Sequence, residues 1–184
     1  MCIVVENQIK LHRWALWLIV KKLTKAIHIE NYVIAGSYRR GNWWCNDIDL
    51  LIPVANEIES KGIQENIKKL GWKLRERIEG DPFSIQYTKE TLGGTLVLDL
   101  FLATPGTWGN ALLFTTGPKE FNDVLRNHMI DIGYSWHNPK YFKHTVKQTQ
   151  ISFSNEKAAL TFLDIKYIQP NKRYQYGQVH KFVD

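Results

Sequence analysis

Two spacings of hydrophobic residues alternate along the first half of the chain. Apolar side chains recur every three or four positions from about Val5 to Ala26, which predicts an amphipathic helix that ends in lysines. A second helix is expected over residues 55–70, where the apolar stripe stops at Gly71. Between them, the runs 31–35 and 47–53 are apolar, β-branched and short, which is typical of buried strands. The pattern therefore predicts two strands enclosed by two helices.

Three more strand-like runs follow, at residues 72–78, 83–88 and 95–103. The last two are separated by a turn that contains Gly93-Gly94, a pair that predicts a tight hairpin. We therefore expect an α+β fold in which a mixed sheet carries two helices on one face.

A change in composition at 104–107 predicts a boundary, so that residues 1–105 and 106–184 would form two domains. The elements expected after the boundary are helices over 108–114 and 118–132, a small sheet from 133–136, 141–145 and 149–153, and a helix over 155–162 with Ser154 as its N-cap. The second domain would be a smaller α/β unit.

Net charge and cysteine content favour some classes of protein over others. The chain of 184 residues has a net charge of +6 and a pI near 9.2, which favours an acidic partner such as nucleic acid but also fits simple solubility. Its cysteines, Cys2 and Cys45, are too few for a disulfide framework or a zinc site and indicate free thiols. The apolar run Trp14–Val20 is too short to span a bilayer. We expect an intracellular protein with no membrane partner.

Asp47 and Asp49 stand out in the second predicted strand. Residues two apart on a strand point to the same face, so both carboxylates would leave the sheet on one side while Ile48 and Leu50 face the other. Two like charges repel, and a divalent cation that prefers oxygen ligands, such as Mg²⁺, would neutralise them. The alternative is a solvated acidic pair on the surface.

The turn between the first two strands reads Gly36-Ser37-Tyr38-Arg39-Arg40-Gly41. Gly36 would let the backbone approach a ligand closely, and Ser37 adds a hydroxyl. Arg39 and Arg40 offer planar donors that fit phosphate oxygens. Beside two carboxylates, these groups indicate a site for a nucleoside triphosphate, although a solvated arginine pair is the simpler alternative.

Asp99 lies in an otherwise apolar run. Apart from Thr95, it is the only polar residue between positions 95 and 103. A charge in such a strand is costly unless it is paired or binds a cation. Exposure at a strand end and a buried ion pair are the alternatives to a metal ligand.

The combined pattern of the glycine turn and Asp47-x-Asp49 resembles the nucleotidyltransferase signature, in particular that of the family X DNA polymerases, the polymerase β-like repair enzymes. The resemblance implies a nucleotidyltransferase palm followed by a small thumb-like domain, as in the minimal members of large DNA viruses. It makes Asp99 the third catalytic carboxylate. Asp47 and Asp49 would bridge two Mg²⁺ ions, for which Mn²⁺ could substitute, and Asp99 would hold the ion near the primer 3′-hydroxyl.

The segment from Phe114 to Arg126 resembles the nucleotide-binding segment of the same family. Phe114 would screen the 2′ side of the sugar, and Gly117 would let the backbone approach the nucleotide. Asn122 would contact the incoming base and Arg126 the template strand. The resemblance further assigns the triphosphate to Gly36, Ser37, Arg40 and the backbone of Asn46, and leaves Arg39 to brace the turn or contact DNA.

Two positions depart from the family pattern. Thr115 replaces an aromatic residue, which leaves sugar discrimination open. Val97 replaces a basic residue found two positions before the third acid in better-known members, so Asp99 would lack that restraint.

The resemblance implies a monomeric, metal-dependent DNA polymerase that fills short gaps in base excision repair. Its partners would be gapped or nicked primer-template DNA and dNTPs, and it would act in the cytoplasm for a cytoplasmic DNA virus and otherwise in the nucleus. Two alternatives stay open. One is a nucleotidyltransferase of the same superfamily that needs no template or modifies a small molecule or tRNA, and the other is a non-catalytic DNA-binding module.

Overall fold

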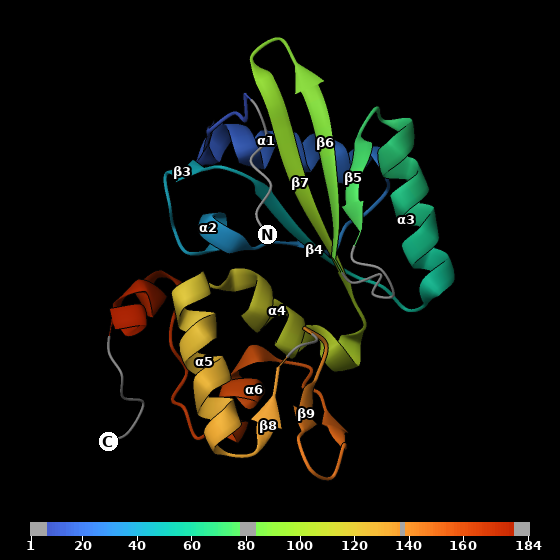
Figure 1. Ribbon diagram of the computed structural model, residues 1–184. Helices are drawn as coiled ribbons and strands as arrows, with labels where there is room; N and C mark the ends of the chain where they lie inside the picture. The colour runs from blue at the N-terminus through green and yellow to red at the C-terminus, as the bar shows by residue number, and fades with distance from the viewer. Residues whose placement is uncertain (1–6, 78–83, 137–138, 179–184) are drawn as a thin grey trace.

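A computed structural model describes residues 7–77, 84–136 and 139–178 of the chain. Its largest element is a five-stranded mixed sheet, in which only β4 and β7 pair in parallel (Figure 1). In spatial order its strands are β2 (Val33–Ile34), β4 (Ile48–Pro53), β7 (Gly94–Ala103), β6 (Ser84–Thr91) and β5 (Lys73–Arg77).

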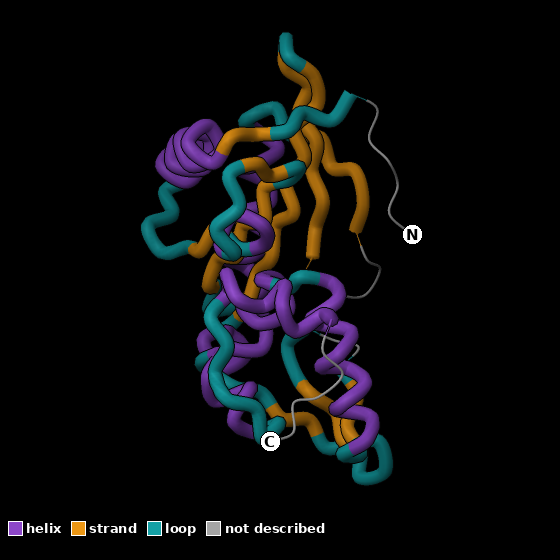
Figure 2. The backbone as a smooth tube through the Cα atoms, turned by 90° about the vertical axis from the view of Figure 1, so that its left-hand side faces the viewer, coloured by secondary structure: helices purple, strands orange, loops and turns teal. Residues whose placement is uncertain are grey.

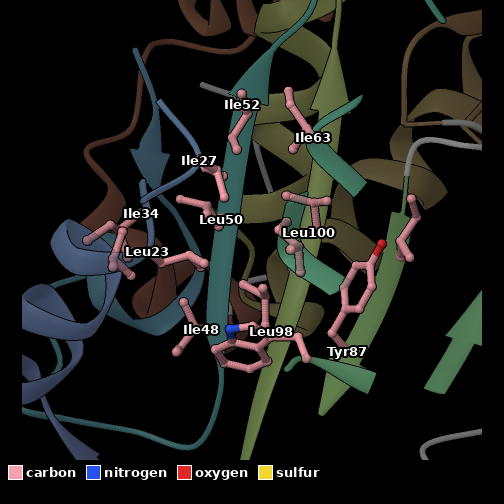
Figure 3. Packing of buried hydrophobic residues seen from close by; sticks show 14 of the residues in the cluster. Leu23, Ile27, Ile34, Ile48, Leu50, Ile52, Ile63, Tyr87, Leu98 and Leu100 are labelled. Carbon is pink, nitrogen blue, oxygen red and sulfur yellow. The ribbon is translucent and has the colours of Figure 1, made fainter. Parts of the chain in front are cut away.

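Helices α1 (Arg13–Ala26) and α3 (Glu57–Lys69) pack on one face of this sheet. Alternate residues of β4 and β7 face these helices, and Ile48, Leu50 and Leu98 are fully buried there (Figure 3). Burial of such side chains stabilises a fold by about 1.5–3 kcal/mol each, so this face supplies much of the core. The arrangement confirms the expected mixed sheet with two helices on one face.

The elements that follow β7 in the chain gather at the end of the sheet where β4 and β7 finish (Figures 1 and 2). They enclose a second cluster of buried residues around Phe121, Leu125 and Phe142. In chain order they are the 3₁₀ turn η1 (Pro105–Thr107), α4 (Trp108–Thr116), α5 (Lys119–Asp131), the antiparallel strands β8 (Tyr134–Ser135), β9 (Phe142–His144) and β10 (Gln150–Ile151), α6 (Glu156–Phe162) and the 3₁₀ segment η2 (Pro170–Gln178).

A third, smaller cluster lies on the face of the sheet opposite α1 and α3. Leu51 and Phe101 of the sheet pack there against Ala111 of α4. Helices α4 and α6 come so close that a Cβ atom on Gly109 would lie 2.3 Å from the backbone of Asn155. The division at residues 105 and 106 stays a prediction, and the α+β fold class is confirmed.

Three local expectations were wrong. Helix α1 begins at Arg13, because Leu11 and His12 form strand β1 and pair with β3 (Trp44–Cys45). The glycine turn contains a short helix, α2 (Gly36–Arg39). The N-cap of α6 is Asn155, whose side chain accepts a hydrogen bond from the Ala158 amide at 2.8 Å.

Some expectations fall outside the described residues, namely Cys2, Val5 and the ends of two predicted strands at Ile78 and Phe83. Among the helices that the structure describes, none is both long and apolar enough to cross a membrane.

Candidate active site

The parallel pairing of β4 and β7 brings two of the predicted carboxylates together. Asp49 and Asp99 are direct register partners, and both side chains are half-buried. They lie on the face of the sheet that does not pack against α1 and α3, the same face as Leu51 and Phe101. Asp47 precedes β4 and is also half-buried.

Without a cation, the negative charges of the three acids repel one another and are poorly solvated. Burial raises the pKa of Asp49 well above its ordinary value, and the charges of Asp47 and Asp99 raise it further, while Arg40 opposes them. Burial also raises the pKa of Asp47, against the effects of its own backbone hydrogen bond and of Arg40. A divalent cation would relieve this repulsion.

The donor set fits magnesium in one particular way. Within the described ranges, no group of three or more His, Cys, Asp and Glu side chains is arranged so that it could hold a metal ion by itself. Mg²⁺, however, is commonly bound by one or two carboxylates together with the phosphates of a substrate. The Asp49–Asp99 pair fits that kind of binding, and the two-ion arrangement stays a prediction.

Gly36 shapes the wall next to the acids. Its φ is +50°, and a Cβ atom at this position would lie 1.7 Å from Oδ2 of Asp49. The amide of Ala35 donates to the carbonyl of Asp49 at 2.8 Å, so this close approach is fixed by the sheet. Any side chain at position 36 would displace the carboxylate.

A cleft of about 710 Å³ lies between the sheet and helices α4 and α5, a size that suits a nucleotide. Two buried polar atoms that belong to its lining residues, Ser37 Oγ and Asn122 Oδ1, have no hydrogen-bond partner among the described residues apart from the Cys45 thiol beside Ser37. Such atoms are rare in folded proteins and suit a bound ligand. The predicted site residues that line the cleft are Gly36, Ser37, Arg40, Asn46, Asp47, Asp49, Phe114, Gly117, Asn122 and Arg126.

Arg40 reaches across the cleft to the C-terminal part of the chain. It donates from Nε to the hydroxyl of Tyr174 at 2.8 Å and from Nη1 to the carbonyl of Thr116. Its guanidinium also lies over the Tyr174 ring, 5.0 Å from the centroid. Arg40 is thus held at the cleft wall, within reach of an anionic ligand.

Arg39 points away from the cleft into a buried ion pair. Its two terminal nitrogens donate to the two carboxylate oxygens of Glu156, each at 3.0 Å, and Arg173 donates to the same carboxylate at 2.8 Å. The side chains of Glu156 and Arg173 are 4% and 0% exposed. This geometry fits the interpretation of Arg39 as a brace, and a contact of Arg39 with DNA stays a prediction.

Phe114 and Arg126 form the far wall. The Phe114 ring meets Trp136 edge-on with centroids 5.6 Å apart, and the Arg126 guanidinium lies 5.7 Å from the Phe114 ring centroid. Arg126 also forms an ion pair with Asp123 at 2.7 Å. The amide of Asn122 donates to the Phe114 carbonyl at 2.9 Å, so Phe114 is held from several sides.

Comparison with known proteins agrees with this geometry. Residues 111–174 match the model of the DNA polymerase beta thumb. Over 144 residues, the chain is 27% identical to the Repair DNA polymerase X of a South African tick isolate of African swine fever virus, and 28% identical to that of a Namibian warthog isolate and of the Badajoz strain. Each match covers 78% of this chain and 82% of the relative. These matches support a family X polymerase.

The thumb match covers one wall of the cleft only. It begins at Ala111 in α4 and ends at Tyr174, so it contains Phe114, Asn122 and Arg126. The three acids lie outside it, Asp49 and Asp99 on the sheet and Asp47 just before β4. The likeness to the DNA polymerase beta thumb therefore rests on the second wall, and the likeness to the viral repair polymerases on a longer stretch, while the roles of the individual site residues stay predictions.

Sequence reasoning missed Gln86, which restrains Asp99. Gln86 donates from Nε2 to Oδ1 of Asp99 at 2.7 Å and accepts from Nη1 of Arg75 at 2.9 Å. The hairpin pairs Thr91 with Gly94, and counting back along this register places Gln86 opposite Asp99. The turn residues are Leu92 and Gly93, whereas a turn at the predicted Gly93-Gly94 pair would have placed Thr88 opposite Asp99, so the expected turn did not reveal this partner.

Val97 and Thr115, the two departures from the family pattern, are both buried. The Thr115 hydroxyl donates to the Ala111 carbonyl at 2.8 Å within α4. The restraint on Asp99 that Val97 cannot supply comes from the neighbouring strand. Several further lining residues were not anticipated, among them Lys10, Trp44 and Lys119.

Proposed function

We propose that the protein is a DNA polymerase of DNA repair that extends a primer 3′-hydroxyl with dNTPs across short gaps. The observation that carries this proposal is that Asp49, the register partner of Asp99, lines one cleft together with Asp47, Ser37 and Arg40. Carboxylates and phosphate-binding groups in one cleft suit a triphosphate that is bound together with a cation. The names of the viral relatives support repair synthesis as the setting.

Each wall would have its own task. The incoming triphosphate would rest against the Ser37 hydroxyl, the backbone near Gly36 and the Arg40 guanidinium. On the opposite wall, Phe114 would lie against the sugar and Asn122 would offer its unpaired Oδ1 to the base. Arg126 would contact the template strand.

The primer hydroxyl would attack the α-phosphate in line, and pyrophosphate would leave toward Ser37 and Arg40. Asp99, oriented by Gln86, would accept the hydroxyl proton. Asp47, Asp49 and Asp99 would hold Mg²⁺, which would supply positive charge to the triphosphate and lower the pKa of the attacking hydroxyl. Mn²⁺ is expected to substitute, and we expect a monomer that acts inside the cell.

The test is extension of a labelled primer on gapped DNA with Mg²⁺ and dNTPs, with wild type beside Asp99→Ala. Asp131→Ala is the matched control, because Asp131 is an exposed aspartate at the end of α5. Templated addition that Asp99→Ala abolishes and Asp131→Ala preserves supports the proposal.

Two other results would redirect it. Addition that ignores the template base favours a nucleotidyltransferase of another kind in the same superfamily. Tight binding of gapped DNA without any extension, by the wild type and with either metal, favours a non-catalytic DNA-binding module.

A further inference from the structure

Three tryptophans are exposed on one surface of the molecule. The exposed fractions of Trp14, Trp43 and Trp44 are 62%, 65% and 57%. Large aromatic side chains normally gain stability from burial, so a group of exposed ones calls for a ligand. They come from α1 and from the segment at β3, elements that contact each other in the fold (Figure 1).

Part of this surface is a groove of about 370 Å³ lined by Arg13, Trp14, Trp17, Tyr38 and Trp43. Trp14 meets Trp17 edge-on at 5.9 Å, and the Arg13 guanidinium lies 4.5 Å from the Tyr38 ring centroid. The groove therefore presents flat aromatic faces beside a cation.

An aromatic path leads from the groove to the active-site cleft. His12 stacks on Trp43 with centroids 5.9 Å apart and meets Trp44 edge-on at 5.2 Å. Trp44 lines the cleft, as does the neighbouring Lys10. The path is rigid, because His12 pairs with Trp44 between β1 and β3 and the Arg13 amide donates to the Trp43 carbonyl at 2.9 Å.

The stretch that forms β1 and α1 contains only cationic charges. No acidic residue occurs between positions 7 and 29, whereas the same stretch contains Lys10, Arg13, Lys21, Lys22 and Lys25. Lys21 lies over the Trp17 ring, 4.7 Å from the centroid. Stacking platforms with cations along them are the physical basis of single-stranded nucleic acid binding, because bases offer π faces and the backbone offers phosphates.

We propose that this groove binds single-stranded nucleic acid, and that the strand follows His12 and Trp44 into the cleft. Bases would stack on Trp14 and Trp43, and phosphates would lie against Arg13 and Lys21. That the bound strand is the unpaired template of a gap rests on the proposed function. That the groove binds a single strand is independent of the proposed function. Peptides and lipid surfaces lack this pairing of stacked rings with regularly spaced anions.

The test is binding of a fluorescent oligothymidine of about 16 nucleotides and of a blunt duplex, each over a range of salt concentrations. The variants are Trp14→Ala, Trp43→Ala and Arg13→Gln, with Ile58→Ala as the control for loss of an exposed apolar side chain on the other helix, α3. Thermal melting of each variant checks that it folds.

We expect each tryptophan variant to weaken single-strand binding by about tenfold, with duplex affinity unchanged. Its salt dependence should stay parallel to that of wild type, because stacking releases no counterions. Arg13→Gln should instead lower the slope against the logarithm of salt concentration by about 0.7. Ile58→Ala should change neither quantity.

Unchanged single-strand affinity in both tryptophan variants would overturn the proposal, as would equal losses on single strand and duplex. A change confined to self-association, seen by sedimentation, would make the surface a protein interface and would also overturn it. Primer extension on gapped DNA is measured separately. A wild type that extends no primer would defeat the proposed function while the single-strand assay still decides this one.

Discussion

The two faces of the β4–β7 strand pair differ in the polarity of their side chains and in what covers them. One face places Ile48, Leu50 and Leu98 in the largest core, and the other places Asp49 and Asp99 side by side, with Asp49 lining a cleft. Successive side chains on a strand point to opposite faces. Neighbouring residues of β4 and β7 therefore belong alternately to the hydrophobic core and to the candidate active site. The comparison teaches that stability and chemistry can be changed separately in one strand.

Asp49→Asn tests this separation most strongly. We expect primer extension to fall by at least about a thousandfold, because the variant removes charge that would bind the cation. The melting temperature of the ligand-free protein should rise, since a half-buried charge beside two like charges is removed. Differential scanning fluorimetry with and without Mg²⁺ gives a readout other than activity. A fall in melting temperature would contradict the comparison.

Leu50→Ala changes the neighbouring residue on the other face. Leu50 is fully buried, so its truncation should reduce the free energy of unfolding by about 2–5 kcal/mol. Urea unfolding measures this loss. Extension per folded molecule should stay near the wild-type value at low temperature, and a large drop in that rate would show that the faces are coupled.

Gln86→Leu asks whether the restraint on Asp99 contributes to chemistry. We expect about a tenfold lower kcat with little change in the KM for dNTP, and a higher Mg²⁺ concentration for half-maximal rate. Folding should be little affected, and Gln86→Asn, which keeps an amide donor, should recover part of the rate. An unchanged Mg²⁺ dependence would reduce Gln86 to a structural contact.

The smallest expected effect is a dependence of stability on pH. Asp47 and Asp49 have raised pKa values in the fold, so the unfolded chain loses these protons first as pH rises. Stability without metal should therefore fall from about pH 4 up to the folded-state pKa values, where the penalty is complete. Melting curves across this window, compared with Asp49→Asn, should show a shallower fall in the variant, and Mg²⁺ should oppose the fall.

Local pattern was enough to predict most strands and helices, and the position of the acids within them. Asp49 faces the cleft because Leu50 faces the core, and that alternation can be read directly from the chain. The register of Asp99 against Asp49 needed the tertiary pairing of β4 with β7, for which only the family resemblance gave a reason.

Contacts between distant residues could not be predicted. Arg39 was expected to brace a turn or touch DNA, but its partner Glu156 is 117 residues away and reads as an ordinary helix residue. Tyr174 and Arg40 are separated by 134 positions. The start of α1 was misplaced for the same reason, since pairing of Leu11 with Cys45 overrides the helical spacing before Arg13.

The Glu156 carboxylate is shared between Arg39 from the sheet side and Arg173 from the C-terminal segment. These ion pairs connect the two walls of the cleft. Because Arg40 directly follows Arg39 in the chain, the ion pair of Arg39 also helps to fix the position of Arg40. We therefore expect Glu156, which does not line the cleft, to influence the width of the cleft mouth. A change at Glu156 should widen or loosen the opening without removing any group inside.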